Sequence, residues 1–538
     1  MIRQWSCVIA FLVLCACARQ TTPNGGPQDK EPPKLLRSTP DNNEKNFKGK
    51  TIELTFDEAV KLKEPKEEII ITPTPGKDIT FQAKQNRITI EFKKGLNDST
   101  TYSIAFREAV QDLTEGNPVD NLRLAFSTGP VIDSLRITGN VVDALTEKIP
   151  QNITVGIYQA DTFNIFKHTP AYFTKTDKQG RFIISNLKAG LYKLYAFDDK
   201  NKNLKLETKT EKFGFIPGKI NLLQNTDSLQ VTMVNLDARP IHLNSVRHTD
   251  KFSRVKFNKS LTRYSVAMAG QKILNTFGDD QSEIKFFYRM PLTDSLAVTI
   301  HGVDSLDATI DSLVYLKTGK SGAPPDPFKT DLKDFVFNIE TGTITTLLTI
   351  TKPIQKITLD SVFLRLDSLT VIPFTPDEFR YDTTINQIEI TKKLDKNIVT
   401  TVTTPIQFYM SANTFISIES DSSKRITKTI TIPKPEDTAT LLLEVQTDKT
   451  DFVVQLLTTD YKQVRSVRNA KKIVFKNILP TEYKIRILLD QNNNNMWDAG
   501  NINKDIPPEK TTFYKNADGK YQFPIRANWE IGPYLISF

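Results

Sequence analysis

Oxygen-bearing side chains recur at alternate positions in a segment near the C-terminus, DQNNNNMWDAGN. Its first, third, fifth and ninth residues are Asp490, Asn492, Asn494 and Asp498. Calcium takes about six to eight oxygen ligands, and a loop with this spacing supplies them by turning alternate side chains inward. The spacing therefore predicts a calcium-binding loop, and calcium is the one cofactor that the sequence suggests.

A second segment, DKNKNLKLE, repeats the same spacing earlier in the chain. Its corresponding residues are Asp199, Asn201, Asn203 and Glu207. Lysines lie among them, so weaker binding is expected in this copy. The alternative for both segments is a long hairpin loop, in which asparagine tolerates left-handed backbone and caps its own turn.

The C-terminal segment also departs from an EF-hand loop. Its sixth position is Asn495 rather than glycine, and its twelfth is Asn501 rather than glutamate. With two carboxylates, the expected dissociation constant is about 10⁻⁴–10⁻³ M, the range of extracellular calcium modules.

Residues suited to catalysis are scarce. No two histidines have a metal-ligand spacing on a helix, and no G-x-S-x-G elbow of a serine hydrolase is present. The segment TGKSG lacks the first glycine of a phosphate-binding loop, because Val314 holds that place. The adjacent acids Asp57 and Glu58 point to opposite faces of a strand. The chain is therefore expected not to be an enzyme.

The N-terminus has the pattern of an export signal. Arg3 precedes an apolar run, and small residues follow it. The run is too short to span a bilayer of about 30 Å as a permanent helix. All three cysteines, Cys7, Cys15 and Cys17, lie in this segment, so the rest of the chain has neither a disulfide nor a thiol nucleophile. Residues 1–16 are predicted to be a signal peptide.

The residues Leu14-Cys15-Ala16-Cys17 resemble the bacterial lipobox. The resemblance implies that Cys17 is the mature N-terminus and carries the lipid, whereas the alternative is an ordinary secretory signal cut near Ala18. By resemblance to the lipoprotein sorting rule, the absence of aspartate at position 18 favours the outer membrane. The sequence does not decide whether the protein faces the periplasm or the cell surface.

The net charge of +9 is spread over 71 basic and 62 acidic residues, without a basic cluster that contains aromatics. Nucleic acid is therefore not expected as a partner. The expected partners are the membrane, through the N-terminal lipid, and proteins of the cell envelope, with a glycan as the alternative.

The elements that must position these residues are strands. Short alternating runs such as TIELTF, RITIEF and YKLYAF recur every ten residues or so and are separated by turn residues. This pattern predicts an all-β fold of tandem β-sandwiches behind the signal peptide and a flexible tether at residues 17–33.

Residues 34–129 resemble the bacterial Ig-like domain of exported proteins. The phrases FDEAV, LNDSTTY and DLTEGN, followed by a strand that ends in FST, occur in that family's order. Looser repeats of this plan predict further Ig-like sandwiches at residues 239–318 and 331–419. The segment GKSGAPPDPFKT, residues 319–330, is predicted to link these two.

Residues 133–236 resemble the transthyretin-like, or carboxypeptidase-regulatory-like, β-sandwich. The passage DKQGRFIISNLKAGLY contains that family's hallmark. Placing Asn477 on Asn186 puts Asp490 on Asp199 without a gap, which predicts a second copy at residues 420–538. The two Asn-rich segments therefore occupy the same place in two repeats.

These observations favour a lipid-anchored, non-enzymatic, modular protein that serves as a scaffold or interaction subunit at the outer membrane. The alternative is a carbohydrate-binding or adhesive surface lipoprotein. Domain resemblance alone does not choose between them, because one fold hosts many functions.

Overall fold

Alternation of apolar and polar residues places one face of each strand in a core. In TIELTF, Ile52, Leu54 and Phe56 are buried and the residues between them are half-buried. The computed structural model describes residues 29–538 apart from 77, 161–162, 269–271, 321–325, 396–397 and 399–404. Residues 1–16, Cys17 and part of the predicted linker lie outside the described residues. The described residues confirm the predicted all-β fold of tandem β-sandwiches.

The first sandwich packs the sheet β1-β2-β6-β5 against the sheet β4-β7-β9, with the pair β3-β8 beside them. Every strand pair is antiparallel. The elements are β1 (Leu35–Thr39), β2 (Thr51–Phe56), β3 (Val60–Leu62), α2 (Pro65–Glu68), β4 (Ile70–Thr72), β5 (Ile79–Lys84), β6 (Arg87–Phe92), β7 (Thr101–Ala105), β8 (Val110–Asp112) and β9 (Arg123–Ser127).

The second sandwich combines the sheet β13-β10-β17 with the sheet β12-β11-β14-β15, and β16 also pairs with β14. The pair β10-β17 is parallel. The strands are β10 (Leu135–Asp143), β11 (Thr154–Gln159), β12 (Tyr172–Lys175), β13 (Arg181–Leu187), β14 (Gly190–Phe197), β15 (Phe213–Phe215), β16 (Ile220–Leu222) and β17 (Thr226–Met233).

The third sandwich consists of the sheets β18-β19-β22-β21 and β20-β23-β24 around one apolar core. Its strands are β18 (Leu243–His248), β19 (Phe252–Phe257), β20 (Arg263–Met268), β21 (Leu274–Phe277), β22 (Glu283–Phe287), β23 (Leu296–Val303) and β24 (Thr309–Leu316).

The fourth sandwich packs β25-β27-β32-β31, with β26 also on β27, against β30-β29-β33-β35, and includes the pair β28-β34. Its elements are β25 (Thr330–Leu332), β26 (Val336–Asn338), β27 (Thr343–Ile350), β28 (Ile354–Ile357), β29 (Val362–Arg365), β30 (Val371–Pro373), η1 (Pro376–Glu378), β31 (Phe379–Asp382), β32 (Gln387–Lys393), β33 (Ile406–Met410), β34 (Phe415–Ser417) and β35 (Ile426–Ile430). Because β35 pairs with β33, this sandwich extends to Ile430 and not to residue 419 as predicted.

The fifth sandwich repeats the topology of the second, strand for strand. Its sheets are β39-β36-β43, with β36 and β43 parallel, and β38-β37-β40-β41, with β42 also on β40. The elements are η2 (Pro435–Asp437), β36 (Ala439–Gln446), β37 (Val453–Thr458), β38 (Gln463–Arg468), β39 (Lys472–Ile478), β40 (Glu482–Leu488), η3 (Ile502–Lys504), β41 (Thr511–Phe513), β42 (Gln522–Pro524) and β43 (Glu530–Ser537).

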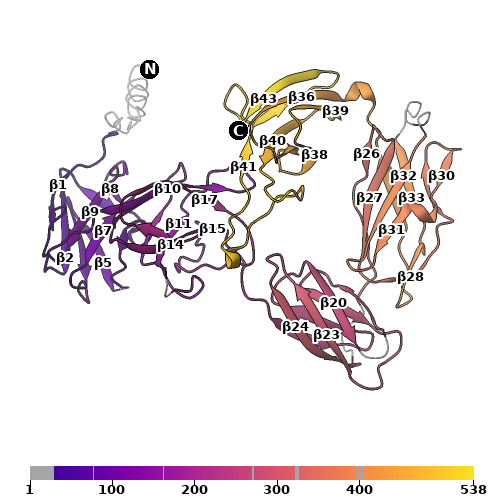
Figure 1. Ribbon diagram of the computed structural model, residues 1–538, viewed down its shortest axis with the longest axis horizontal. Helices are drawn as coiled ribbons and strands as arrows, with labels where there is room; N and C mark the ends of the chain where they lie inside the picture. Colours follow the sequence, from indigo (N-terminus) through magenta and orange to yellow (C-terminus); the bar gives the residue numbers. More distant parts are fainter. Residues whose placement is uncertain are drawn as a thin grey trace, which may run out of the picture.

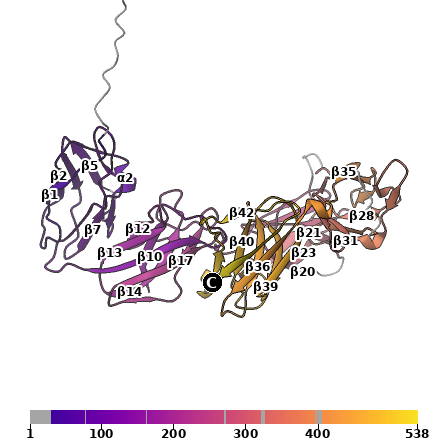
Figure 2. The ribbon, with the colours of Figure 1, turned by 90° about the horizontal axis from the view of Figure 1, so that it is seen from above.

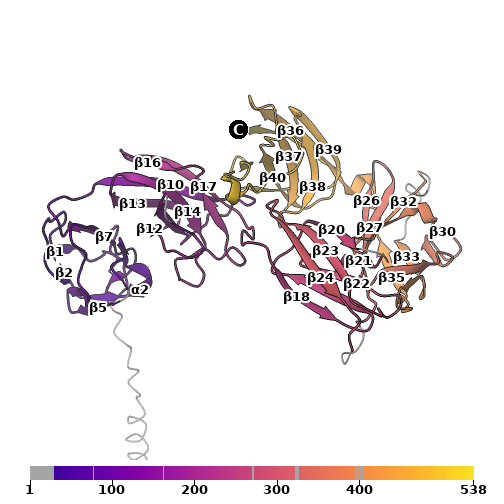
Figure 3. The same cartoon turned by 60° about the horizontal axis from the view of Figure 1, so that its bottom comes forward.

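The order of the sandwiches in space differs from their order in sequence. The chain passes from the second sandwich through the third and fourth and then turns back, so that the fifth lies beside the second (Figures 1 and 2). The view from a third direction gives the same arrangement (Figure 3). Among the described residues, no helix is long and apolar enough to cross a membrane.

Candidate functional site

The C-terminal Asn-rich loop follows β40 and is organised by Asp490. This fully buried carboxylate accepts hydrogen bonds from the backbone N–H groups of Asn494 and Asn495, both at 3.0 Å. Asn493 and Asn495 have φ angles of 63° and 64°. Asparagine adopts this left-handed backbone more readily than most residues. The residue types therefore suit the turn as well as they suit a cation.

The four predicted ligands converge in this loop. Asn492 and Asn494 donate their side-chain amides to Asp498 Oδ2 at 2.7 and 2.8 Å. Asn494 Oδ1 accepts the N–H of Met496 at 2.7 Å. The amide groups of both asparagines thus face the Asp498 carboxylate. A turned amide would present its oxygen there instead, as a cation requires.

The earlier loop has nearly the same geometry. Asp199 accepts the backbone N–H groups of Asn203 and Leu204 at 3.0 and 3.1 Å. Asn201 and Asn203 donate their side-chain amides to Glu207 Oε1 at 2.8 and 3.0 Å. All four predicted residues therefore lie together in this copy too.

Sequence reasoning missed one glutamate in each loop. Glu509 accepts the backbone N–H groups of Gln491 at 2.8 Å and Asp498 at 3.1 Å. Glu211 accepts those of Lys200 at 3.1 Å and Glu207 at 2.9 Å. The sequence does show an acid downstream of each loop. However, Glu509 and Glu211 lie at different separations from the first aspartate of their loops, so an ungapped alignment of the two repeats does not match them.

Burial governs the charge of these glutamates. Desolvation raises the pKa of Glu509, and the nearby Asp498 and Asp490 raise it further against the two backbone hydrogen bonds. The pKa of Glu211 is raised for the same reasons, with Asp199 and Glu207 as the neighbouring acids. A bound cation would favour the ionised form of both groups. Across the described residues, no group of three or more His, Cys, Asp or Glu side chains is arranged to hold a metal, so calcium binding stays a prediction.

The C-terminal loop continues into residues 497–508, which form an inserted loop between sandwiches. Trp497 donates its indole N–H to the Glu509 carbonyl at 2.9 Å, and it packs with Ile502 against an apolar cluster of the second sandwich. Asn501 donates its side-chain amide to the carbonyl of Leu306 in the third sandwich at 2.6 Å. The inserted loop therefore joins three sandwiches.

A polar junction holds the fifth sandwich on the second. Lys484 Nζ lies 2.5 Å from Glu147 Oε1, and both side chains are largely buried. Arg486 donates to the Leu145 carbonyl at 2.9 Å. Thr511 donates to the Ala144 carbonyl at 2.5 Å. Local sequence patterns give no signal for contacts between residues so far apart in the chain.

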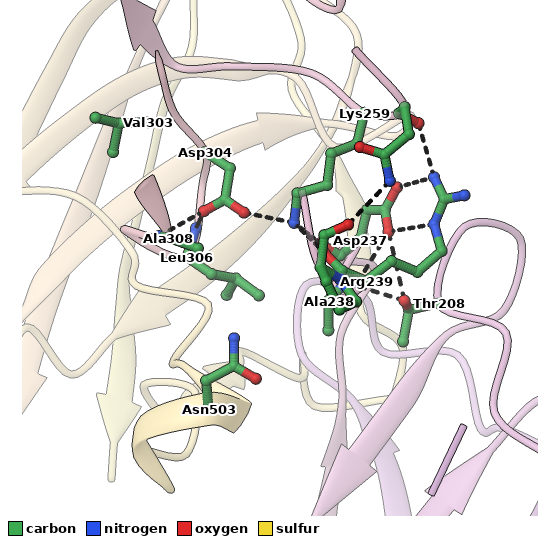
Figure 4. A network of polar contacts seen from close by, with 12 residues as sticks. Thr208, Asp237, Ala238, Arg239, Lys259, Val303, Asp304, Leu306, Ala308 and Asn503 are labelled. Carbon is green, nitrogen blue, oxygen red and sulfur yellow. Dashed lines mark hydrogen bonds and ion pairs between the residues drawn. The ribbon is translucent and has the colours of Figure 1, made fainter. Parts of the chain in front are cut away.

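A buried ion pair between Lys259 and Asp304, both in the third sandwich, lies where the connection from the second sandwich reaches the third (Figure 4). Lys259 also donates to the carbonyls of Asp237 and Arg239 at 2.9 and 2.8 Å. Asp304 accepts the backbone N–H of Leu306 at 2.8 Å. The pair therefore ties β23 and its following turn to the connection from the second sandwich.

The histidines are scattered and have separate structural partners. His248 Nδ1 lies 2.6 Å from Ser253 Oγ, and His301 Nδ1 lies 2.8 Å from Asp311 Oδ1. Burial lowers the pKa of His248, and Lys317 lowers it further. These contacts offer no assembled acid–base site.

The chain is thus a modular protein of tandem β-sandwiches with polar junctions. Its N-terminal part, residues 29–128, matches the bacterial Ig-like domain family. The first sandwich is therefore a bacterial Ig-like domain, which confirms that resemblance. No curated protein matches the chain significantly.

Solved structures offer distant likenesses. The major pilin subunit BcpA of Bacillus cereus is 11% identical, with 76% of this chain and 99% of that chain covered and a TM-score of 0.14. Domains 1–6 of the surface layer protein SbsC are 10% identical, with 90% and 67% covered and a TM-score of 0.16. SGBP-B of the Bacteroides ovatus mixed-linkage glucan utilization locus, solved with a heptasaccharide, is 11% identical, with 69% and 89% covered and a TM-score of 0.15. These scores are too low to support a shared arrangement or function.

Proposed function

We propose that the protein is a lipid-anchored, non-enzymatic scaffold or interaction subunit of the outer membrane. The observation that carries this proposal is the return of the fifth sandwich onto the second through Lys484 and Glu147. Domains joined only by flexible linkers would not make a specific contact of this kind between the fifth and the second. A chain closed on itself holds several sandwich surfaces in fixed relative positions, which suits it to organise partner proteins.

The junction supports a fixed arrangement energetically. Loss of one partner from a buried ion pair typically costs about 3–5 kcal/mol, because the other charge stays buried without compensation. The inserted loop adds apolar contacts, because Trp497 and Ile502 pack against the apolar cluster of the second sandwich. Calcium, if bound there, would stiffen this junction and would have no chemical step to perform.

The anchoring part of the proposal rests on the sequence around Cys17 and on the Gly- and Pro-containing segment that follows it. A Gly- and Pro-containing composition is typical of a tether between a lipid anchor and the first folded domain. Several acyl chains on one residue would retain the protein durably, at about 0.8 kcal/mol per buried methylene.

Affinity purification from detergent-solubilised envelopes tests this function. An epitope tag fits the exposed turn at residues 517–519, because Gly519 has open space around it. We expect a partner protein to co-purify in stoichiometric amount. The Cys17→Ala variant, with the same tag, should leave the membrane fraction and lose this partner. Recovery of the wild-type protein without any stoichiometric partner would contradict the scaffold role, and unchanged membrane retention of Cys17→Ala would contradict the anchor.

A further inference from the structure

A groove of about 1370 Å³ runs between the first and second sandwiches. One wall contains Arg107 and residues 118–123 of the bacterial Ig-like domain. The other contains Arg136, residues 138–140 and residues 174–179 of the second sandwich. Clefts between domains are a common place for ligand sites.

Contacts across the groove fix the two walls relative to each other. Arg107 pairs with Glu68 at 3.0 Å within the first sandwich and donates to Asn152 Oδ1 of the second at 2.6 Å. Lys178 of the second sandwich pairs with Glu108 of the first at 2.8 Å. The groove is therefore shaped before any ligand enters, which reduces the entropic cost of binding.

Most charged side chains along the groove pair with one another, and among the described residues three do not: the cations Arg123 and Lys175 and the acid Asp120. Arg136 pairs with Asp227 at 3.5 Å, and Arg181 pairs with Asp177 at 3.0 Å. Arg123 and Lys175 have no carboxylate within ion-pair distance among the residues that the structure describes.

Neighbouring protein atoms partly desolvate both cations, although the Arg123 side chain is exposed and that of Lys175 is half-buried. Desolvation lowers the pKa of Arg123. It also lowers the pKa of Lys175, and the positive charge of Arg107 adds to that effect, whereas the more distant carboxylates of Glu68, Glu67 and Asp199 act against it. Arg123 has one weak neutral contact, to Ser185 Oγ at 3.5 Å. An anion would relieve both cations, and the guanidinium group can hold a carboxylate or phosphate through two hydrogen bonds.

Neutral polar groups make up much of the remaining lining. Amide and hydroxyl side chains open to solvent there are Asn121, Asn140, Gln151, Gln179, Ser185 and Ser228. Phe182, the one aromatic among the described lining residues, is buried in the core. The groove thus offers hydrogen-bond partners for hydroxyl groups beside apolar surface that includes the exposed Ile183, a mixed lining that suits both the hydroxyls and the C–H faces of a sugar.

We propose that this groove binds an acidic oligosaccharide, with its carboxylates or phosphates on Arg123 and Lys175 and its hydroxyls on the surrounding amides. The ligand site is separate from the junction that carries the scaffold proposal, since it lies between the first two sandwiches.

Calorimetric titration of the full-length protein in detergent tests the proposal. The probes are a galacturonic acid hexamer, a phosphorylated mannose oligosaccharide, the neutral maltohexaose and an acidic peptide of aspartate and glutamate. We expect at least one of the two acidic sugars to bind more tightly than maltohexaose and the peptide, and to bind more weakly as salt is added. The better acidic sugar identifies the anion as carboxylate or phosphate.

Two groove variants, Arg123→Met and Lys175→Met, should each weaken binding of the acidic sugar about tenfold, as expected for the loss of one charge-assisted contact. The matched control is Arg380→Ala, which removes an arginine that is 87% exposed on the fourth sandwich and should leave binding unchanged. Unchanged melting curves will show that the groove variants fold. Equal binding of acidic and neutral sugars, tighter binding of the peptide, or full affinity in both groove variants would overturn the proposal. None of these results bears on envelope partners, so the scaffold role is tested independently.

Discussion

Lys484 of the fifth sandwich places its ammonium group 2.5 Å from the carboxylate of Glu147 in the second, across 337 residues of chain. Lys484 also lies over the Tyr461 ring, with Nζ 4.1 Å from the centroid. The contact closes the path through the second, third, fourth and fifth sandwiches. This buried pair, the hydrogen bonds beside it and the inserted loop together therefore hold these four sandwiches in their relative positions.

The first prediction concerns this closure. Lys484→Met leaves the Glu147 carboxylate buried without its cation, at a cost of about 3–5 kcal/mol to the closed arrangement. We expect the radius of gyration from small-angle X-ray scattering to increase as the fifth sandwich leaves the second. The double variant Glu147→Leu with Lys484→Met should restore the wild-type radius, because it removes both charges. As a control, Asp460→Asn breaks an exposed pair with Lys462 and should leave the radius unchanged.

The same pair predicts a response to acid. Burial acts to raise the pKa of Glu147, but hydrogen bonds, led by that from Lys484, outweigh it and hold the pKa below the ordinary 4.5. A carboxylate with a depressed pKa stabilises the closed state above its ordinary value, and this stabilisation is lost as pH falls through the depressed value. We expect scattering to report opening below pH 4.5. The Glu147→Gln variant should show a weaker response over that range, and an equal response in both proteins would assign the opening to other acids.

Much of the fold follows from local pattern. Alternating runs such as TIELTF and RITIEF became strands with one buried face, because a period of two matches the pleat. The two Asn-rich loops also followed from spacing, since Asp490 and Asp199 each organise their own loop through nearby backbone groups. Structure that depends on interactions between residues close together in the chain can therefore be predicted from the residue pattern of a single sequence.

Contacts between distant segments leave no such signature. Glu147 and Lys484 are ordinary charged residues in their local sequence, and only the packing of two sandwiches makes them a pair. The end of the fourth sandwich was missed for a related reason. The short strand β35 alternates like its neighbours, and its pairing with β33, rather than its composition, decides which sandwich it belongs to.

A third prediction addresses the junction between the second and third sandwiches. Lys259→Met would leave Asp304 buried beside two backbone N–H groups without its cation, and we expect destabilisation of about 3–5 kcal/mol. Scanning calorimetry of the full chain should show one transition at a lower temperature. The control Lys256→Met removes a lysine that is 44% exposed and 3.9 Å from Asp280, and its effect should stay within about 1 kcal/mol. Equal decreases in transition temperature for Lys259→Met and Lys256→Met would show that the buried pair contributes no more to stability than the exposed one.

The last prediction concerns calcium. If Asp490 and Asp498 bind the ion with the amide oxygens of Asn492 and Asn494, calcium at ten times its dissociation constant should stabilise the protein by about 1.4 kcal/mol. Because the expected dissociation constant is about 10⁻⁴–10⁻³ M, a calcium concentration of about 10 mM is sufficient to show a melting shift. The Asp498→Asn variant should abolish the shift from this loop, since it removes the carboxylate that both asparagine amides face. Glu207→Gln is the matched change in the earlier loop, where Glu207 takes the place of Asp498, and magnesium at equal concentration controls for ionic strength. The absence of a calcium-specific shift in the wild-type protein would leave the hairpin-loop explanation, in which the asparagines are selected for their left-handed backbone at Asn493 and Asn495.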